Sequence, residues 1–470
     1  MYLEFFAKFS LILLVFLLPL EARWIFDQAD LKGTPFEYGT GALYFTDILL
    51  FISAFLTVLW KWRNGSKEFA PKAHLSPRLM SLGFTPVAEK VKSEKLLFIY
   101  ILIAGFGLMA LAGIGQAEDR KIALYAVMRL WEGLILWWLI QNNPVRPIFL
   151  IMAFVGSAML EAVWGMEQLF FQIVPANKWL GEAFHSASVL GDSVLQTSNG
   201  RFLRAYGTLP HPNILGGMLS AAILLLCGLI TGGTEQRYKI HDARFKAIVW
   251  GGLIILIFGL FFSFSRSAWL ALGVGILFGG IWMIAAKQKR LLAGIIFTLV
   301  ICAAVLILIF PESLSRFSQN QSLEILSVSE RVREYDDAQI IVREKPFVGI
   351  GINQYVKELQ NIYPSFSAWK IHPIHNIYLL ILSELGIIGF LIFIIIISWH
   401  LSFSKISSPA ASPRGEPPLL IWTGAAAIGL LAIGLFDHYL WTLHFGVLLF
   451  WMILGINHRL ADEFSQKGSA

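Results

Sequence analysis

Long apolar runs separated by short polar stretches follow one another along the chain up to residue 457. A run of about 18 or more apolar residues can cross a bilayer as a helix. The short segments of alternating hydrophobicity that a membrane β-barrel needs are missing. The pattern therefore predicts an all-α membrane protein with about twelve transmembrane helices. The expected spans are residues 3–20, 43–60, 96–115, 121–140, 147–174, 212–231, 247–263, 266–286, 291–310, 375–399, 419–436 and 438–457.

One apolar region, residues 247–286, is too long for a single span. A helix of about 40 residues would be about 60 Å long, twice the bilayer core of about 30 Å. The polar sequence SFSRSAW, Ser263 to Trp269, interrupts this region. We expect a tight turn there, with one span on each side.

Composition agrees with a membrane protein. The 470 residues are 56% hydrophobic and only 14% charged, and the mean hydropathy is +0.66. A soluble protein of this size would need far more polar surface. Cys227 and Cys302 both lie within apolar runs, so we expect small core residues there and no disulfide.

Lysine and arginine indicate the orientation. They gather in loops 61–95, 232–246 and 287–290, which all fall on one side of a twelve-span chain. The positive-inside rule makes that side cytoplasmic, together with both termini and the linker 407–418. The basic excess is then a topology signal and does not indicate a nucleic-acid partner. Residues 3–20 lack a following cleavage signature, so we expect an uncleaved first span.

Three larger segments, residues 21–42, 175–211 and 311–374, are expected on the opposite, outer face. The last is mixed in charge and has helical stretches, which predicts a partly helical extracytoplasmic cap between spans nine and ten. The chain then divides into residues 1–310 with nine spans, the cap at 311–374, and residues 375–470 with three spans and a cytoplasmic C-terminus.

Three distant segments bring arginine and histidine to this outer face. Arg204 precedes the sixth span, Arg266 lies in the turn between spans seven and eight, and His375 opens the tenth. Arginine offers a planar fork of donors that fits phosphate oxygens, so both arginines are candidates for binding an anionic headgroup. The alternative is that arginines at span ends simply reach toward lipid headgroups.

His375 is expected just inside a helix start, with Pro373 at the first helical position. The positive end of the helix dipole would keep its imidazole neutral, so that it could accept a proton. The alternative is a histidine that only caps the helix. Glu384 would lie about 13 Å deeper on the opposite face of the helix. We expect it to be a structural residue, with Arg129, Glu132 or a tyrosine hydroxyl as partner.

Weaker candidates surround these residues. Asp437 and His438, in the outer turn between the last two spans, could line the same cavity. The sequence GIG at 349–351 is too short for a phosphate loop and is interpreted as a turn. No zinc-ligand spacing or aspartate-rich motif is present, so we expect neither a metal nor a cofactor.

Four stretches together resemble the superfamily of O-antigen ligases and polymerases, which are polytopic bacterial glycosyltransferases. They are RAYGTLPHPNILGGML from Arg204, FSFSRSAWLAL from Phe262, RVREYDDAQIIVREKPFVGIGINQY from Arg331 and HPIHNIYLLILSELGIIG from His372. The order and the long outer loop agree with the family over residues 200–460. The first 200 residues are similar only in the pattern of spans.

The resemblance implies a transferase of lipopolysaccharide biosynthesis, in the bacterial inner membrane, with its active site facing the periplasm. It would move a glycan from undecaprenyl diphosphate to a hydroxyl of a lipid or glycan acceptor, without a metal. Arg204 and Arg266 would bind the diphosphate, and His375 would act as base or orienter. Direct attack would invert the anomeric carbon. Further substrate-binding candidates are Arg201, His211, His372 and Asn376.

Several reactions fit this donor. We favour ligation to lipid A-core over polymerisation of O-antigen or exopolysaccharide and over transfer to protein. A transporter or lipid flippase is a different class with a similar number of spans. A carrier would have two similar six-span halves and a binding site at the midplane, whereas here the halves differ and the polar groups gather at the outer face. A flippase would need a cationic cavity that reaches both faces.

Overall fold

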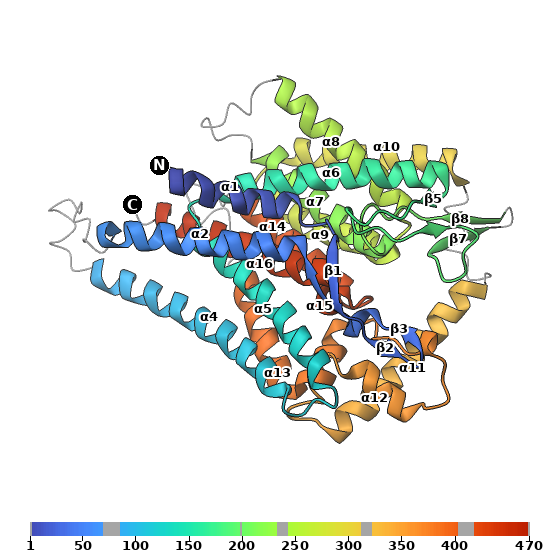
Figure 1. The fold of residues 1–470 in the computed structure, drawn as a ribbon. Coiled ribbons are helices and arrows are strands. Elements are labelled where there is room, and N and C mark those ends of the chain that lie inside the picture. Colours follow the sequence, from blue (N-terminus) through green and yellow to red (C-terminus); the bar gives the residue numbers. More distant parts are fainter. Residues whose placement is uncertain are drawn as a thin grey trace.

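The computed structural model describes residues 2–68, 85–197, 200–232, 243–311, 322–402 and 418–468. The chain forms a bundle of helices with both termini at the same end (Figure 1). Short strands and two helices, α11 (Ser322–Glu344) and α12 (Tyr355–Ile362), lie toward the opposite end. This arrangement separates the membrane-type helices from the segments that were expected on the outer face.

The described residues contain nine helices that are long and apolar enough to cross a membrane. Two shorter apolar helices, Leu97–Gly113 within α4 (Thr85–Gly113) and α14 (Pro418–Ile433), occupy two further expected spans. The 15-residue α1 (Tyr2–Phe16) lies at the place of the first expected span. The prediction of a multi-pass helical membrane protein is confirmed, with nine of the twelve expected spans at full length. The nine are α2 (Phe45–Glu68), α5 (Arg120–Asn142), α6 (Pro147–Phe171), α7 (Pro212–Thr231), α8 (Ala243–Phe262), α9 (Arg266–Ala285), α10 (Lys289–Ile309), α13 (Ile377–Ser402) and α16 (His444–Gly468).

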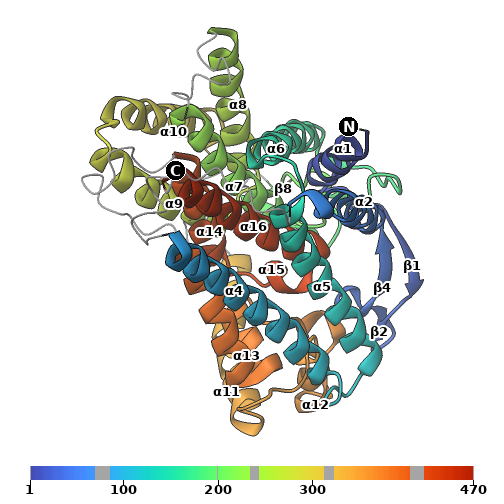
Figure 2. The ribbon, with the colours of Figure 1, turned by 90° about the vertical axis from the view of Figure 1, so that its left-hand side faces the viewer.

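Helix α7 is the central element of the bundle. Nearly all its residues are buried, and it packs against α6, α8, α9 and α14 (Figure 2). Glycine lets neighbours approach closely: a Cβ at Gly217 would lie 1.9 Å from the hydroxyl oxygen of Tyr439. Tyr439 begins α15 (Tyr439–Thr442), a single turn that replaces the expected start of the last span at residue 438.

The segments between the membrane-type helices also contain short strands, which the sequence did not predict. Antiparallel pairs form between β1 (Arg23–Asp27) and β4 (Gly41–Tyr44), β2 (Asp30–Leu31) and β3 (Thr34–Pro35), β5 (Ile173–Val174) and β6 (His185–Ser186), and β7 (Val194–Thr197) and β8 (Gly200–Leu203). In the β2–β3 hairpin Lys32 and Gly33 both have positive φ, the requirement of a tight type I′ turn. Each pair is too short to give a clear alternating pattern in the sequence.

We call residues 322–374 the outer cap. Its core is shared with residues far away in the sequence, because Leu31 and Phe36 of the N-terminal segment pack into it. The partners of these two side chains come from the start of α5, from α11, from α12 and from the chain leading into α13. They are Ile122, Ala338, Ile341, Ile350, Tyr355, Val356, Leu359, Ile371, Ile374 and Leu380. This packing holds α11 above the start of α13.

Helix α13 is interrupted at Gly386, which has φ 64°. Residues 346–351 of the cap pair with the interruption: Ile350 N donates to Ser383 O at 3.0 Å, and Ile387 N donates to Pro346 O at 2.8 Å. A Cβ at Gly386 would lie 2.3 Å from the backbone of Phe347, so glycine is needed for this close approach. The GIG sequence is therefore more than a turn, because it docks into α13.

Glu384 lies beside this interruption, and its partner differs from those expected. Trp441 Nε1 donates to Glu384 Oε2 at 2.8 Å. Arg129 instead donates to Asp47 and lies 2.7 Å from Glu132. A tryptophan indole was not considered from the sequence, because α15 was expected to be part of a continuous span.

Candidate active site

Arg204 is held where α7 begins and where α8 ends. Its Nε donates to Ser263 O at 2.8 Å, and its Nη2 donates to Asn213 Oδ1 at 2.7 Å. The next residue, Ala205, donates its N–H to Phe262 O at 3.0 Å and so ties this segment to the end of α8. Arg204 is only 5% exposed. Its guanidinium therefore has a fixed position between α7 and α8.

Asn213 connects Arg204 to the loop between α14 and α15. Asn213 Nδ2 donates to Asp437 Oδ2 at 2.9 Å, and the backbone N–H of His438 donates to Asp437 Oδ1 at 2.9 Å. A continuous polar path thus runs from Arg204 through Asn213 to Asp437. Asn213 thus links Arg204 to the turn of Asp437 and His438, which the sequence suggested as candidates to line the same cavity.

Arg266 is the first residue of α9, directly after the tight turn that was expected between α8 and α9. Ser265 is the N-cap and accepts from Ala268 N, and Phe264 has φ 46° within the turn. Arg204 binds the carbonyl of Ser263 in the same turn. Both arginines therefore lie around one turn of backbone, with Arg266 half-buried.

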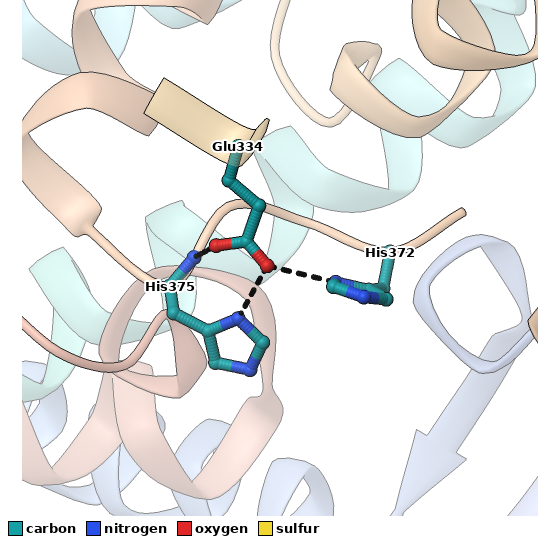
Figure 3. Close-up of side chains that lie close together, drawn as sticks. All are labelled: Glu334, His372 and His375. Atoms are coloured by element: carbon teal, nitrogen blue, oxygen red, sulfur yellow. Dashed lines mark hydrogen bonds and ion pairs between the residues drawn. The ribbon is translucent and has the colours of Figure 1, made fainter. Parts of the chain in front are cut away.

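His375 is paired with a carboxylate from the outer cap. Glu334, on α11, accepts from His375 Nδ1 and from its backbone N–H, both at 2.9 Å. Figure 3 shows the carboxylate between this ring and that of His372, whose Nδ1 lies 3.4 Å from Glu334 Oε1. The Glu334 carboxylate fixes the orientation of the His375 ring and faces its Nδ1, leaving Nε2 for another partner.

The position of His375 differs from the expected one. The helix begins at Ile377, and Asn376 is its cap: Asn376 Oδ1 accepts from Tyr378 N at 3.0 Å and Leu379 N at 3.1 Å. His375 therefore precedes the helix instead of sitting inside its first turn. Pro373 is likewise outside the helix. The helix dipole therefore acts on Asn376, whose side chain was expected to bind substrate. The orientation and pKa of the His375 ring are set by Glu334 instead.

The protonation preferences of this group follow from burial and charge. Burial alone would lower the pKa of His375, but the hydrogen bond and the charge of Glu334 raise it above its ordinary value. Burial alone would raise the pKa of Glu334, but its bonds from His375 lower it. Burial lowers the pKa of His372. The pair is thus a carboxylate and an imidazole of increased basicity, contrary to the neutral imidazole expected from the helix dipole.

Two further residues connect the histidine and arginine groups. The ring of His438 lies 5.2 Å from that of His375 and 5.3 Å from that of Tyr38, measured between ring centroids. Burial lowers the pKa of His211 to about 3, and the charges of Arg204, Asp437 and His375 also act on it. The ring contact of His438 with His375, together with the hydrogen bonds of Asn213 to His211 and Asp437, places these groups around one region of the bundle.

Two of the expected binding residues have structural contacts. Both ring nitrogens of His211 are engaged: Nδ1 accepts from Asn213 N at 3.1 Å, and Nε2 lies 2.7 Å from Ser193 Oγ. Arg201 lies on β8, and its Nη2 donates to Val189 O at 3.1 Å. In the part of the chain that the structure describes, Arg201 contacts the loop between β6 and β7, whereas His211 caps α7 beside Asn213.

Two groups of described residues have ligand atoms within 4.8 Å of one another, as a metal site would need. The first is Glu334, His372 and His375. The second is Asp47, Glu132 and His444, where Arg129 Nη1 lies 3.0 Å from Asp47, 2.7 Å from Glu132 and 2.8 Å from His444. The Arg129 guanidinium therefore occupies the place that a metal ion would take in the second group.

Comparison with known proteins covers part of this site. No curated protein matches the chain. A family model described as O-Antigen ligase matches residues 251–394. The matched region contains Arg266, Glu334, His372 and His375, and Arg204 lies outside it. Residues 251–394 therefore form an O-antigen ligase family domain, in agreement with the resemblance found in the sequence.

Proposed function

We propose that this protein transfers a glycan from undecaprenyl diphosphate to an acceptor hydroxyl at the outer face of the bacterial inner membrane. The observation that carries the proposal is the meeting of Arg204, the Arg266 turn and the Glu334–His375 pair around Asp437 and His438. These groups come from five separate segments of the chain. Their meeting at helix ends favours a reaction at the membrane surface.

In this reaction Arg204 and Arg266 bind the diphosphate of the donor. Charge-assisted hydrogen bonds from the two guanidinium groups neutralise the charge that grows on the diphosphate as it leaves. Because Arg204 is already oriented by Ser263 and Asn213, little reorganisation is needed when the donor binds. The two arginines supply the positive charge that a divalent metal supplies in many other transferases.

His375 removes the proton of the acceptor. Its Nδ1–H donates to Glu334, so the lone pair of Nε2 is available to the acceptor hydroxyl. The hydroxyl oxygen forms a bond to the anomeric carbon while the bond from that carbon to the diphosphate oxygen breaks. Undecaprenyl diphosphate leaves with the electron pair, and the proton passes from Nε2 to solvent. Attack from the opposite face inverts the anomeric configuration.

Ligation to lipid A-core is the reaction that we favour. The test is to incubate the purified protein, in lipid nanodiscs, with undecaprenyl-diphosphate glycan and three acceptors: lipid A-core, a second lipid-linked glycan and an acceptor protein. Mass spectrometry then identifies the product. A product with lipid A-core supports ligation, and a product only with the second glycan indicates a polymerase. Modified protein indicates an oligosaccharyltransferase, and no product with any acceptor contradicts the transferase.

A further inference from the structure

Glu334, His372 and His375 form a cluster whose ligand atoms point at one another. Glu334 Oε1 lies 2.9 Å from His375 Nδ1 and 3.4 Å from His372 Nδ1, and Figure 3 shows the three groups converging from α11 and from the chain before α13. All three ligand atoms lie within 4.8 Å of one another. His372 Nδ1 also lies 3.4 Å from Pro373 O, so it has the carboxylate and one carbonyl as neighbours.

The donor set suits one kind of cation. Two imidazole nitrogens and one carboxylate oxygen are ligands that zinc prefers, whereas magnesium and calcium prefer oxygen ligands alone. Ligands about 2.1 Å from a tetrahedral zinc ion lie about 3.4 Å from each other. The 3.4 Å between Glu334 and His372 fits this spacing, and the 2.9 Å between Glu334 and His375 needs only a small opening.

The cluster is also oriented and accessible. Glu334 Oε2 accepts the backbone N–H of His375, which holds the carboxylate with Oε1 toward the rings. The side chain of Glu334 is 3% exposed, whereas those of His372 and His375 are 21% and 31% exposed. The two rings are therefore partly exposed beside a carboxylate that the backbone holds in place.

We propose that Glu334, His372 and His375 bind a zinc ion and that the bound ion switches the transferase off. The second half of this proposal rests on the proposed function. In the transferase, the ring proton of His375 is on Nδ1 and the lone pair is on Nε2. Zinc takes the lone pair of Nδ1, and the neutral ring then carries its proton on Nε2. Nε2 becomes a donor and no longer accepts the proton of the acceptor hydroxyl.

Zinc binding is tested on the full-length protein without any transfer reaction. Competition with a chromophoric chelator measures zinc affinity and stoichiometry, and cobalt serves as a spectroscopic probe of the ligands. We expect one zinc ion per chain. Affinity should fall about tenfold or more in His372→Ala and in Glu334→Gln. His185→Ala is the matched control, because His185 also lies 2.9 Å from a carboxylate on the outer face, that of Asp192.

The zinc-binding measurement can support the site or overturn it. Unchanged affinity in His372→Ala and Glu334→Gln, or no binding at micromolar zinc, would overturn the site. Size-exclusion elution and helix content check that each variant is folded. If one variant does not fold, the other variant and the cobalt spectrum of the unmodified protein still test the site. Nitrogen ligands change the cobalt spectrum, and a spectrum without that change would contradict the assignment.

Inhibition is tested separately in the transfer reaction. Saturating zinc should lower turnover at least tenfold, and a chelator should restore it, while magnesium should have no such effect. Zinc should inhibit His372→Ala only at concentrations raised in proportion to its lost affinity. Zinc binding without loss of turnover, or with increased turnover, would overturn the switch but leave the site. If no transfer is observed at all, the proposed function fails while the binding result still stands.

Discussion

Arg204 is held by the ends of membrane helices, whereas His375 is held by a single carboxylate of the outer cap. The partners of Arg204 that the structure gives are neutral, a backbone carbonyl and an amide oxygen. The partner of His375 is charged and titratable. We call Arg204 and Arg266 the arginine side of the site, and Glu334, His372 and His375 the histidine side.

In the proposed function, the arginine side binds the donor and the histidine side transfers the proton. In this proposal, the carbonyl of Ser263 and the amide of Asn213 orient the Arg204 guanidinium toward the diphosphate of the donor. In the same proposal, the charge of Glu334 increases the basicity of the His375 imidazole, which suits the ring to proton transfer. The following substitutions should therefore affect donor binding on one side and turnover on the other.

The largest effect is expected for His375→Ala. Turnover should fall about 10²–10⁴-fold, the usual range for a positioned general base, while the donor remains bound by the arginines. Donor affinity and single-turnover rate of the purified variant measure the two quantities. A variant that lost donor binding but transferred normally at saturating donor would make His375 a phosphate ligand.

Arg204→Ala and Arg266→Ala should each raise the barrier by about 2–4 kcal/mol, by analogy with the loss of an oxyanion-stabilising donor. Unlike the histidine change, they should also weaken donor binding. Lysine at either position should restore activity only in part, because it lacks the planar fork. Normal turnover of both folded alanine variants would remove the arginine side from the mechanism.

Glu334→Gln should have a smaller effect, about 10–100-fold in turnover with unchanged donor affinity, because it disturbs the orientation and tautomer of the imidazole without removing the base. The readout is the separation of kcat from KM for the donor. Glu334→Asp should recover part of the loss. Equal losses of donor affinity and turnover would indicate that Glu334 only holds the cap in place.

The smallest effect should come from Asn213→Ala, which breaks the path between Arg204 and Asp437. Leaving buried polar atoms without this partner should cost about 1–3 kcal/mol of unfolding free energy, and donor affinity should fall only a few-fold. Denaturant unfolding in detergent and donor titration measure these changes. A large loss of turnover at saturating donor would show that the two sides are not separable.

The sequence was sufficient for features that depend on composition and on local breaks in it. Apolar runs predicted the membrane helices, and the serine-rich interruption predicted the turn before Arg266. The positive-inside rule, applied to the predicted spans, placed Arg204, Arg266 and His375 on the same membrane face. These predictions need only local sequence and one count of charges.

Features that depend on tertiary contacts were missed. Glu334 lies in a helix with several other charged residues, and nothing in its spacing distinguishes it from a solvated side chain. Trp441 as the partner of Glu384 depends on where α15 ends. The start of α13 is different, because Asn376 is a favoured N-cap residue and its signal was present in the sequence.

The interrupted helix α13 also has a consequence for how the protein is made. At Gly386 the helix leaves backbone N–H and C=O groups without partners in their own segment, and such groups are costly in a lipid environment. Their partners, residues 346–351, are synthesised earlier and lie on the far side of the turn that carries His372 and His375. The emerging helix therefore completes its hydrogen bonds only when it meets this earlier segment. Completion of the hydrogen bonds of α13 is therefore coupled to the folding of the chain that leads to His375.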